Sequence, residues 1–212
     1  MAGLPENRLP TSMSELVLSA VHSVIYSIFS DPTRRLRCCS PSLRSRMAML
    51  WIAGSLLSVG CETEETTTRT DTFFCQTDLG SCGEVLVSVI AGATNTIEGA
   101  IYSLTLTEVA EALVSAVDRG VQVWIVYESD QVKDDMIDIL QKGGVFLRAD
   151  GNSAAMHHKF LVADGKVVAN GSFNWTNNAN YNNDENLQVI YSSDIASLFS
   201  VEFLRLWEAA VQ

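Results

Sequence analysis

The feature that most constrains the fold of this chain is an alternation of helical and strand patterns between residues 84 and 150. Apolar residues at helical spacing predict three helices, over 84–93, 106–120 and 130–144. Apolar, β-rich runs beside them predict three strands, over 96–104, 121–129 and 145–150. Helices that alternate with buried strands build a layered α/β domain around a largely buried sheet.

After residue 155 the pattern changes to hairpins. Two strand patterns, over 158–163 and 166–172, are separated by Asp164-Gly165, and Asp-Gly is the strongest short signal for a hairpin. A further strand over 185–192 and a long amphipathic helix over 193–211 complete the chain. The predicted fold class is therefore α/β, with a layered mixed β-sheet flanked by helices.

Polar side chains gather at this hairpin. Because alternate strand residues share a face, His157 and Lys159 point one way and His158 points the other. Across the hairpin, Ser172 and Asn174 also share a face. An imidazole, an ammonium, a hydroxyl and a carboxamide together suit a phosphate group. No carboxylate cluster of the kind that Mg²⁺ requires accompanies them, so no metal or other cofactor is expected.

These residues follow the spacing H-x-K-x4-D-x6-G-S-x-N, and in this the chain resembles the phospholipase D superfamily. All fixed positions are matched, by His157, Lys159, Asp164, Gly171, Ser172 and Asn174. Six fixed positions recur by chance in about one in 10⁵ chains of this size or fewer. The resemblance runs from about residue 73 to the C-terminus. It is strongest to the compact branch with one motif per chain, which includes bacterial endonucleases and enzymes of the mitochondrial cardiolipin-hydrolase type.

The resemblance implies a role for each of these residues. His157 would be the nucleophile of a covalent phosphohistidine that water resolves, while a second motif histidine protonates the leaving oxygen. Lys159, Ser172 and Asn174 would hold the phosphate oxygens as charge develops. Glu185 matches the acidic residue that orients a catalytic imidazole in this family. The scheme requires no metal.

The position of the second histidine leads to a prediction about assembly. Displacement at phosphorus needs the nucleophile and the acid on opposite sides of the phosphate, yet the chain holds a single motif. His158 faces away on the strand, and His22 lies in the N-terminal extension. We therefore expect a two-fold homodimer in which both chains supply His157 to one active site, as in the single-motif relatives.

Several residues near the motif are expected to have structural roles. Asp164 belongs to a hairpin turn, and Gly171 is expected to allow close backbone approach beside the phosphate. His158 is interpreted as a packing or rim histidine, and Trp175 as a core residue rather than a ring that stacks on a ligand. Apart from Glu185, the asparagine-rich segment 181–186 is interpreted as a loop.

The N-terminal third carries different signals. Residues 47–61 form an uncharged apolar run that is short for a membrane span but typical of a signal-peptide hydrophobic region. It ends in Ser58-Val59-Gly60-Cys61, which resembles a bacterial lipoprotein cleavage site with Cys61 as the lipidated residue. The expected location is thus an exported protein tethered to a membrane, in a bacterial periplasm or at a cell surface. An uncleaved membrane anchor and a buried core helix are the alternatives.

The flanking segments complete the expected domain organisation. Residues 1–46 form an N-terminal extension, unless translation starts at an internal methionine such as Met47. Residues 62–72 are interpreted as a polar tether and residues 73–212 as the catalytic domain. Within that domain, Cys75 and Cys82 are compatible with a disulfide in an oxidising compartment or with two free thiols.

The charge distribution bears on function. Residues 62–212 carry eight basic and twenty-two acidic side chains, a formal −14, and residues 1–61 carry a formal +3, which gives −11 for the chain. Such an acidic domain argues against a protein that coats nucleic acid. The resemblance implies a metal-independent phosphodiesterase of the phospholipase D type, and this charge together with the apolar run 47–61 favours phospholipid as its substrate. The alternatives are a membrane-tethered endonuclease that cleaves DNA or RNA and a catalytically idle dimeric scaffold.

Overall fold

The computed structural model describes residues 68–75 and 81–211. Within them, seven strands and five helices follow one another along the chain. They are β1 (Arg69–Phe74), α2 (Cys82–Gly92), β2 (Thr96–Ile101), α3 (Thr107–Asp118), β3 (Gln122–Tyr127), α4 (Asp134–Lys142), β4 (Phe146–Ala149), β5 (Lys159–Ala163), β6 (Val167–Gly171), α5 (Asn177–Tyr181), β7 (Asn186–Tyr191) and α6 (Ser193–Ala209).

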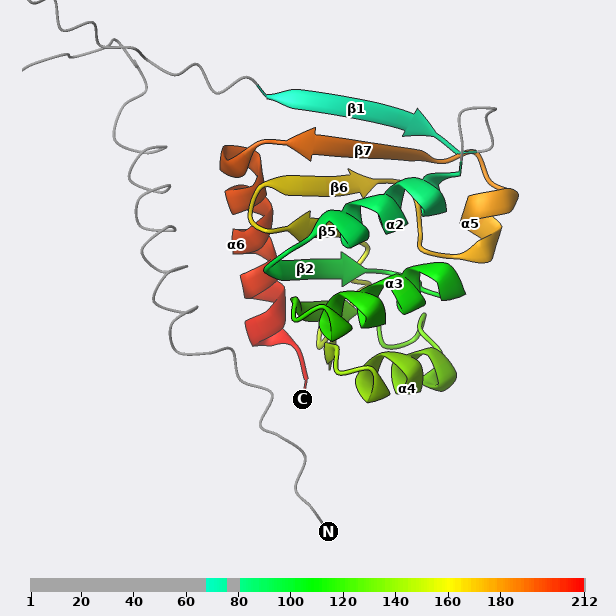
Figure 1. Ribbon diagram of the computed structural model, residues 1–212. Helices are drawn as coiled ribbons and strands as arrows, with labels where there is room; N and C mark the ends of the chain where they lie inside the picture. The colour runs from blue at the N-terminus through cyan, green and yellow to red at the C-terminus, as the bar shows by residue number, and fades with distance from the viewer. Residues whose placement is uncertain (1–67, 76–80, 212) are drawn as a thin grey trace, which may run out of the picture.

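The strands form one mixed sheet in the order β1-β7-β6-β5-β2-β3-β4 (Figure 1). β2, β3 and β4 pair in parallel, which follows from the helices that connect them. β5, β6, β7 and β1 pair in antiparallel fashion, and β5 joins the two halves by pairing with β2. The mixed α/β sheet predicted from the sequence is confirmed.

Helices cover both faces of this sheet. α2 and α3 pack on one face, where Leu86 and Leu113 meet Leu161 in one buried cluster. α6 packs on the other face, where Phe203 and Trp207 belong to a second buried cluster (Figure 1). Because both faces are covered, the central strands are apolar at nearly every position rather than at alternate positions.

Two elements of the fold were not predicted. β1 begins at Arg69. Residues 69–72, which were assigned to the polar tether, therefore belong to the sheet, and the predicted domain start at residue 73 is wrong. β1 lies at the sheet edge and pairs only with β7, so its polar side chains stay accessible and its sequence looks like a linker. The short helix α5 was also missed. It is capped by the Thr176 hydroxyl, which accepts a hydrogen bond from the Ala179 amide at 3.1 Å.

A disulfide ties the edge strand to the rest of the domain. Cys75 and Cys82 form a disulfide, with their Cα atoms 5.2 Å apart. The sequence left a disulfide and two free thiols open, and the structure has the disulfide. The bridge joins the end of β1 to the first residue of α2, whose N-terminus is closed by a capping box between Ser81 and Glu84.

The signals of the N-terminal third lie outside the described residues. The extension 1–46, the apolar run 47–61 with Cys61, and the tether up to residue 67 all belong to this part. Across residues 68–75 and 81–211, no helix has the length and apolar character needed to span a bilayer.

Candidate active site

The motif side chains lie where four central strands, β2, β5, β6 and β7, begin or end on the same side of the sheet. Ile101 at the end of β2 is opposite Lys159 at the start of β5, and Gly171 at the end of β6 is opposite Leu187 near the start of β7. The antiparallel pairing therefore brings chain segments far apart in sequence to one edge. The side chains placed there are Tyr102, His157, Lys159, Ser172, Asn174 and Glu185.

His157 and Lys159 contact each other directly. The Lys159 Nζ atom lies 3.2 Å from His157 Nδ1 and donates to the His157 carbonyl oxygen at 2.9 Å. Because an ammonium only donates, Nδ1 is the acceptor in this contact.

Lys159 is buried, with 9% of its surface exposed. Burial lowers the pKa of its ammonium, and the nearby Glu185 carboxylate acts in the opposite direction. The buried cation has given up hydration that its contacts with His157 replace only in part. A phosphate oxygen would supply the missing interaction, since it is an anionic acceptor.

Glu185 is held by its own loop and by Ser172. The Ser172 hydroxyl donates to Glu185 Oε2 at 2.5 Å and accepts from the Asn186 amide at 3.1 Å. The Asn183 side-chain amide donates to Glu185 Oε1 at 3.0 Å. Within the described part of one chain, both carboxylate oxygens thus bind neighbours of Glu185, and neither contacts an imidazole.

Asn174 has unused hydrogen-bonding capacity. Its Oδ1 atom is buried and has no hydrogen-bond partner among residues 68–75 and 81–211. A buried amide oxygen without a partner destabilises the folded state, so such atoms mark places where another group binds. Asn174 is therefore a binding candidate on structural grounds, independently of the motif.

His158 and Trp175 take the places expected from strand alternation. His158 Nε2 lies 3.1 Å from Glu202 Oε1 on α6, and its ring packs against Phe160, on the face of the sheet away from His157. Trp175 is 1% exposed and belongs to the core. Neither side chain takes part in the His157–Lys159 contact.

Asp164 lies at the opposite end of β5 from Lys159. Its carboxylate accepts hydrogen bonds at 2.7–3.2 Å from the amides of Thr94, Asn95 and Thr96 and from the Thr94 hydroxyl. Burial alone would raise the pKa of Asp164, but these donors lower it below its ordinary value. Asp164 adopts the left-handed conformation of its turn, with φ 53°, so it is a turn residue that ties the α2–β2 loop to the hairpin.

Gly171 allows two strands of the sheet to approach each other closely. A Cβ atom at this position would lie 2.1 Å from the carbonyl oxygen of Asn186. Glycine is therefore required where the backbones of β6 and β7 meet, and a close approach of this backbone to a phosphate stays a prediction. Gly171 acts on the site indirectly, because this close packing of β6 and β7 fixes the positions of Ser172 and Asn174, which come directly after β6.

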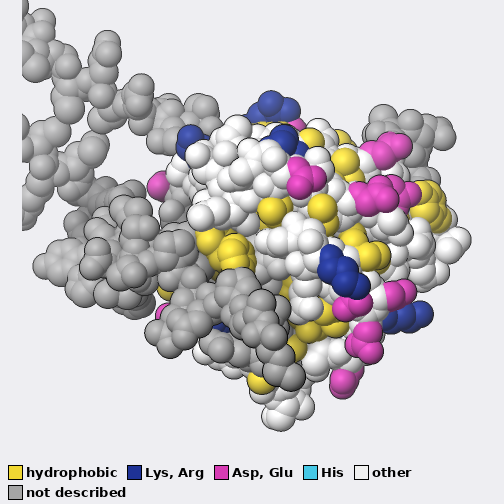
Figure 2. Space-filling view, turned by 60° about the horizontal axis from the view of Figure 1, so that its bottom comes forward, with side chains coloured by type: hydrophobic (Ala, Val, Ile, Leu, Met, Phe, Trp, Pro, Cys, Tyr) yellow, Lys and Arg dark blue, Asp and Glu magenta, His cyan; other side chains and the backbone are white. Residues whose placement is uncertain are grey.

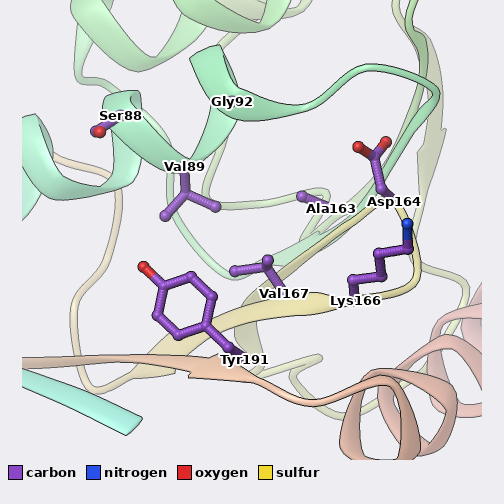
Figure 3. A pocket seen from close by; sticks show the side chains of 8 residues that line it. All are labelled: Ser88, Val89, Gly92, Ala163, Asp164, Lys166, Val167 and Tyr191. Atoms are coloured by element: carbon purple, nitrogen blue, oxygen red, sulfur yellow. The ribbon is translucent and has the colours of Figure 1, made fainter. Parts of the chain in front are cut away.

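Two cavities lie near the ends of β5. The larger, of about 300 Å³, surrounds the Asp164 end and is lined by Ser88, Val89, Gly92, Ala163, Asp164, Lys166, Val167 and Tyr191 (Figure 3). The smaller, of about 180 Å³, adjoins the motif end and is lined by Tyr102, residues 128–131 and residues 152–155. A choice of binding site by cavity volume alone would therefore select the Asp164 end of β5, where His157 does not lie.

Sequence reasoning missed two residues beside the motif. The ring of Tyr102 packs on that of His157, and Lys159 Nζ lies over the same ring. Glu128 is buried, and its carboxylate accepts a hydrogen bond from the Met156 amide at 2.7 Å, which fixes the backbone next to His157. Both residues directly follow a parallel strand, and that position, where α/β sheets bind their ligands, was the available signal.

Comparison with known proteins identifies the family. The family model described as cardiolipin synthase, PLD-like domain, matches residues 86–207. The chain therefore belongs to the phospholipase D-like family, as the motif indicated.

Particular relatives refine this result. The mitochondrial cardiolipin hydrolase of Chlamydomonas reinhardtii is 32% identical over 121 residues, which cover 56% of this chain and 54% of the relative. Among solved structures, Nuc from Salmonella typhimurium, a phospholipase D family member, is similar with a TM-score of 0.63 at 29% identity, covering 68% of this chain and 97% of Nuc. NucT from Helicobacter pylori gives 0.62 at 25% identity, with coverage of 68% and 99%. The chain thus spans about half the length of the cardiolipin hydrolase but nearly the whole of both structures.

Proposed function

We propose that this protein is a metal-independent phosphodiesterase that hydrolyses phospholipid through a phosphohistidine on His157. The observation that carries the proposal is the direct contact of His157 with the buried Lys159 at the edge of the sheet where Ser172, Asn174 and Glu185 also lie. Among the described residues, no group of three or more His, Cys, Asp or Glu side chains could hold a metal ion.

The hydrogen bond between Lys159 Nζ and His157 Nδ1 suggests how substrate starts the reaction. A bound phosphate attracts the Lys159 ammonium, which releases His157 Nδ1. A carboxylate at Nδ1 then holds the imidazole proton there, so that Nε2 has a free electron pair. Nε2 forms the bond to phosphorus while the bond to the leaving oxygen breaks, and this oxygen takes a proton from a second imidazole. Water, deprotonated by that imidazole, then attacks phosphorus and releases His157.

The second imidazole supports a homodimeric site. His158 contacts Glu202 on the opposite face of the sheet, so within the described part of one chain it does not face His157. A two-fold axis beside His157 would bring the partner's copy of the same imidazole to the far side of the phosphate. It would also bring a second Glu185 near the site, which offers the carboxylate at Nδ1 that His157 does not contact within residues 68–75 and 81–211 of one chain.

Lipid is favoured over nucleic acid for two reasons. The similar protein from Chlamydomonas reinhardtii is named a cardiolipin hydrolase, and cardiolipin is a lipid. The segment 62–212 also carries a formal −14, and Figure 2 shows acidic side chains distributed over one face among basic ones. Cleavage of DNA or RNA is the second candidate, because the same motif serves nucleases of the compact branch. An idle scaffold is the third, and it is disfavoured because His157, Lys159 and Asn174 are all present.

The location also remains a proposal. The apolar run 47–61 would hold the domain at a membrane, either as a lipoprotein-type signal ending at Cys61 or as an uncleaved anchor. Fractionation of cells that express the tagged full chain, followed by carbonate extraction, tests membrane attachment. Substitution of Cys61 by Ser separates the two readings, because only the lipoprotein requires this thiol.

The activity assay uses the full chain in excess chelator, with cardiolipin-containing vesicles and single-stranded DNA in parallel. Release of phosphatidate from vesicles that is lost in His157→Asn is the expected result. DNA cleavage with intact lipid would replace the lipid proposal by the nuclease, and no cleavage of either substrate would reject both. Adding excess His157→Asn protein tests the dimer, because chains that exchange into mixed dimers share a single imidazole and wild-type turnover falls. Unchanged turnover after subunit exchange would indicate a monomeric site.

A further inference from the structure

We propose that Tyr102 is a positioning residue whose ring holds His157 and Lys159 in the arrangement that phosphoryl transfer needs. This inference rests on the proposed function and adds to it a side chain outside the motif. Tyr102 lies about fifty-five residues before His157 in the chain, and only the pairing of β2 with β5 brings the two together.

The backbone fixes the position of Tyr102. It follows β2 directly, and its amide donates to the His158 carbonyl oxygen at 2.9 Å. This bond continues the β2–β5 pairing one step beyond Ile101 and Lys159, so Tyr102 is carried on the sheet rather than on a free loop. A side chain on such a rigid support can restrain its neighbours.

The ring of Tyr102 contacts both reactive groups. Its centroid lies 4.4 Å from that of the His157 imidazole, with an angle of 57° between the planes, and 4.9 Å from Lys159 Nζ. His157 is itself exposed, so few other contacts restrict its rotation. A nucleophile must point at phosphorus in line with the leaving oxygen, and small misplacements cost much of the rate.

The same ring acts on Lys159 through charge. Burial lowers the pKa of the Lys159 ammonium, which weakens its hold on a proton. The negative face of an aromatic ring attracts a cation and favours the charged form. Tyr102 thus helps Lys159 to stay charged for phosphate binding, together with the Glu185 carboxylate.

The cavity beside Tyr102 makes the ring necessary. Tyr102 lines the cavity of about 180 Å³ together with polar residues of the loops at 128–131 and 152–155. The ring also contacts His157, so Tyr102 adjoins both the cavity and the imidazole. A smaller side chain would open this space to the imidazole and let it rotate away from the phosphate.

Three variants of the full chain test the proposal. Tyr102→Leu removes the ring and Tyr102→Phe keeps it. Tyr127→Leu is the matched control, because Tyr127 is half-buried at the end of the neighbouring strand β3. With bis(p-nitrophenyl) phosphate as substrate, we expect Tyr102→Leu to lower kcat about 10- to 100-fold with a much smaller change in KM. Tyr102→Phe and Tyr127→Leu should remain close to wild type.

A spectroscopic readout separates positioning from folding and from activity. The chain has three histidines, so the ring-nitrogen signals of His157 in ¹⁵N-histidine-labelled protein are identified by comparison with His157→Asn. We expect these signals to be kept in Tyr102→Phe and to move toward tautomer-averaged positions in Tyr102→Leu. If the wild type cleaves no phosphodiester, the proposed function fails while the spectra still decide on Tyr102. Wild-type kcat and spectra in Tyr102→Leu, or equal losses in the Leu and Phe variants, would overturn the proposal.

Discussion

The two ends of β5 carry residues of one motif but differ in how their hydrogen bonds are used. At the first end, and among residues 68–75 and 81–211, Lys159 is buried with only His157 groups as hydrogen-bond partners, and the nearby Asn174 has a buried oxygen without a partner. At the other end, the Asp164 carboxylate accepts from three backbone amides and a hydroxyl. Between these two ends, unused hydrogen-bonding capacity distinguishes the residues available to a ligand from the saturated carboxylate that maintains the fold.

The largest contrast is expected between the two adjacent histidines. His157→Asn removes the proposed nucleophile and should lower phosphodiester turnover by at least about 10⁴-fold, the loss that follows removal of a covalent nucleophile. His158→Asn alters a group that contacts Glu202 on α6 and should leave turnover nearly unchanged. Steady-state assays of both variants check this. The reverse ranking would place the reactive imidazole on the other face of the sheet.

The two lysines of the hairpin provide the next test. Lys159→Gln removes the buried cation beside His157, and we expect a loss in kcat of about 10²–10³-fold, as for removal of a group that stabilises transition-state charge. Lys166→Gln is the matched control at the turn, where Lys166 is exposed on the rim of the larger cavity (Figure 3). Comparable losses in the two variants would show that overall charge, rather than position, governs activity.

Asp164→Asn should act on stability instead of chemistry. Asparagine also tolerates the left-handed conformation, so the change isolates the carboxylate. We expect the free energy of unfolding to fall by about 1–2 kcal/mol, because backbone donors lose a charged acceptor. The kcat per folded molecule should stay constant. Urea unfolding and active-site titration measure the two quantities, and a fall in kcat at unchanged stability would assign Asp164 to the chemistry.

The smallest effect is the pH dependence of that stability difference. The pKa of Asp164 is lower in the folded protein than in the unfolded chain, so its contribution is complete above the unfolded value of about 4. It is lost as the pH falls through the folded pKa. The difference between wild type and Asp164→Asn should therefore be constant at neutral pH and shrink below about pH 4, as followed by urea unfolding across pH. A difference that grows on acidification would contradict the assigned sign.

Local patterns predicted most of the regular structure between residues 84 and 211. Helical and strand periodicities are set by residues a few positions apart, so α2, α3, β3, α4 and α6 could be inferred from short windows. The exposed edge strand β1 and the short helix α5 have weak local patterns, and both were missed. β1 exists because β7 offers it a partner, which no window around residues 69–74 contains.

The sequence by itself determined the motif, its spacing, and the opposite orientation of His157 and His158, because these depend on neighbours along one strand. Tertiary structure decided which distant groups join them. Tyr102 reaches His157 only through the β2–β5 pairing, and Gly171 is required only because the Asn186 backbone lies against it. It also separated Asp164 from Lys159 and His157, since the four residues 160–163 of the extended strand β5 lie between Lys159 and Asp164. Contacts of this kind depend on the register between strands, which local sequence does not specify.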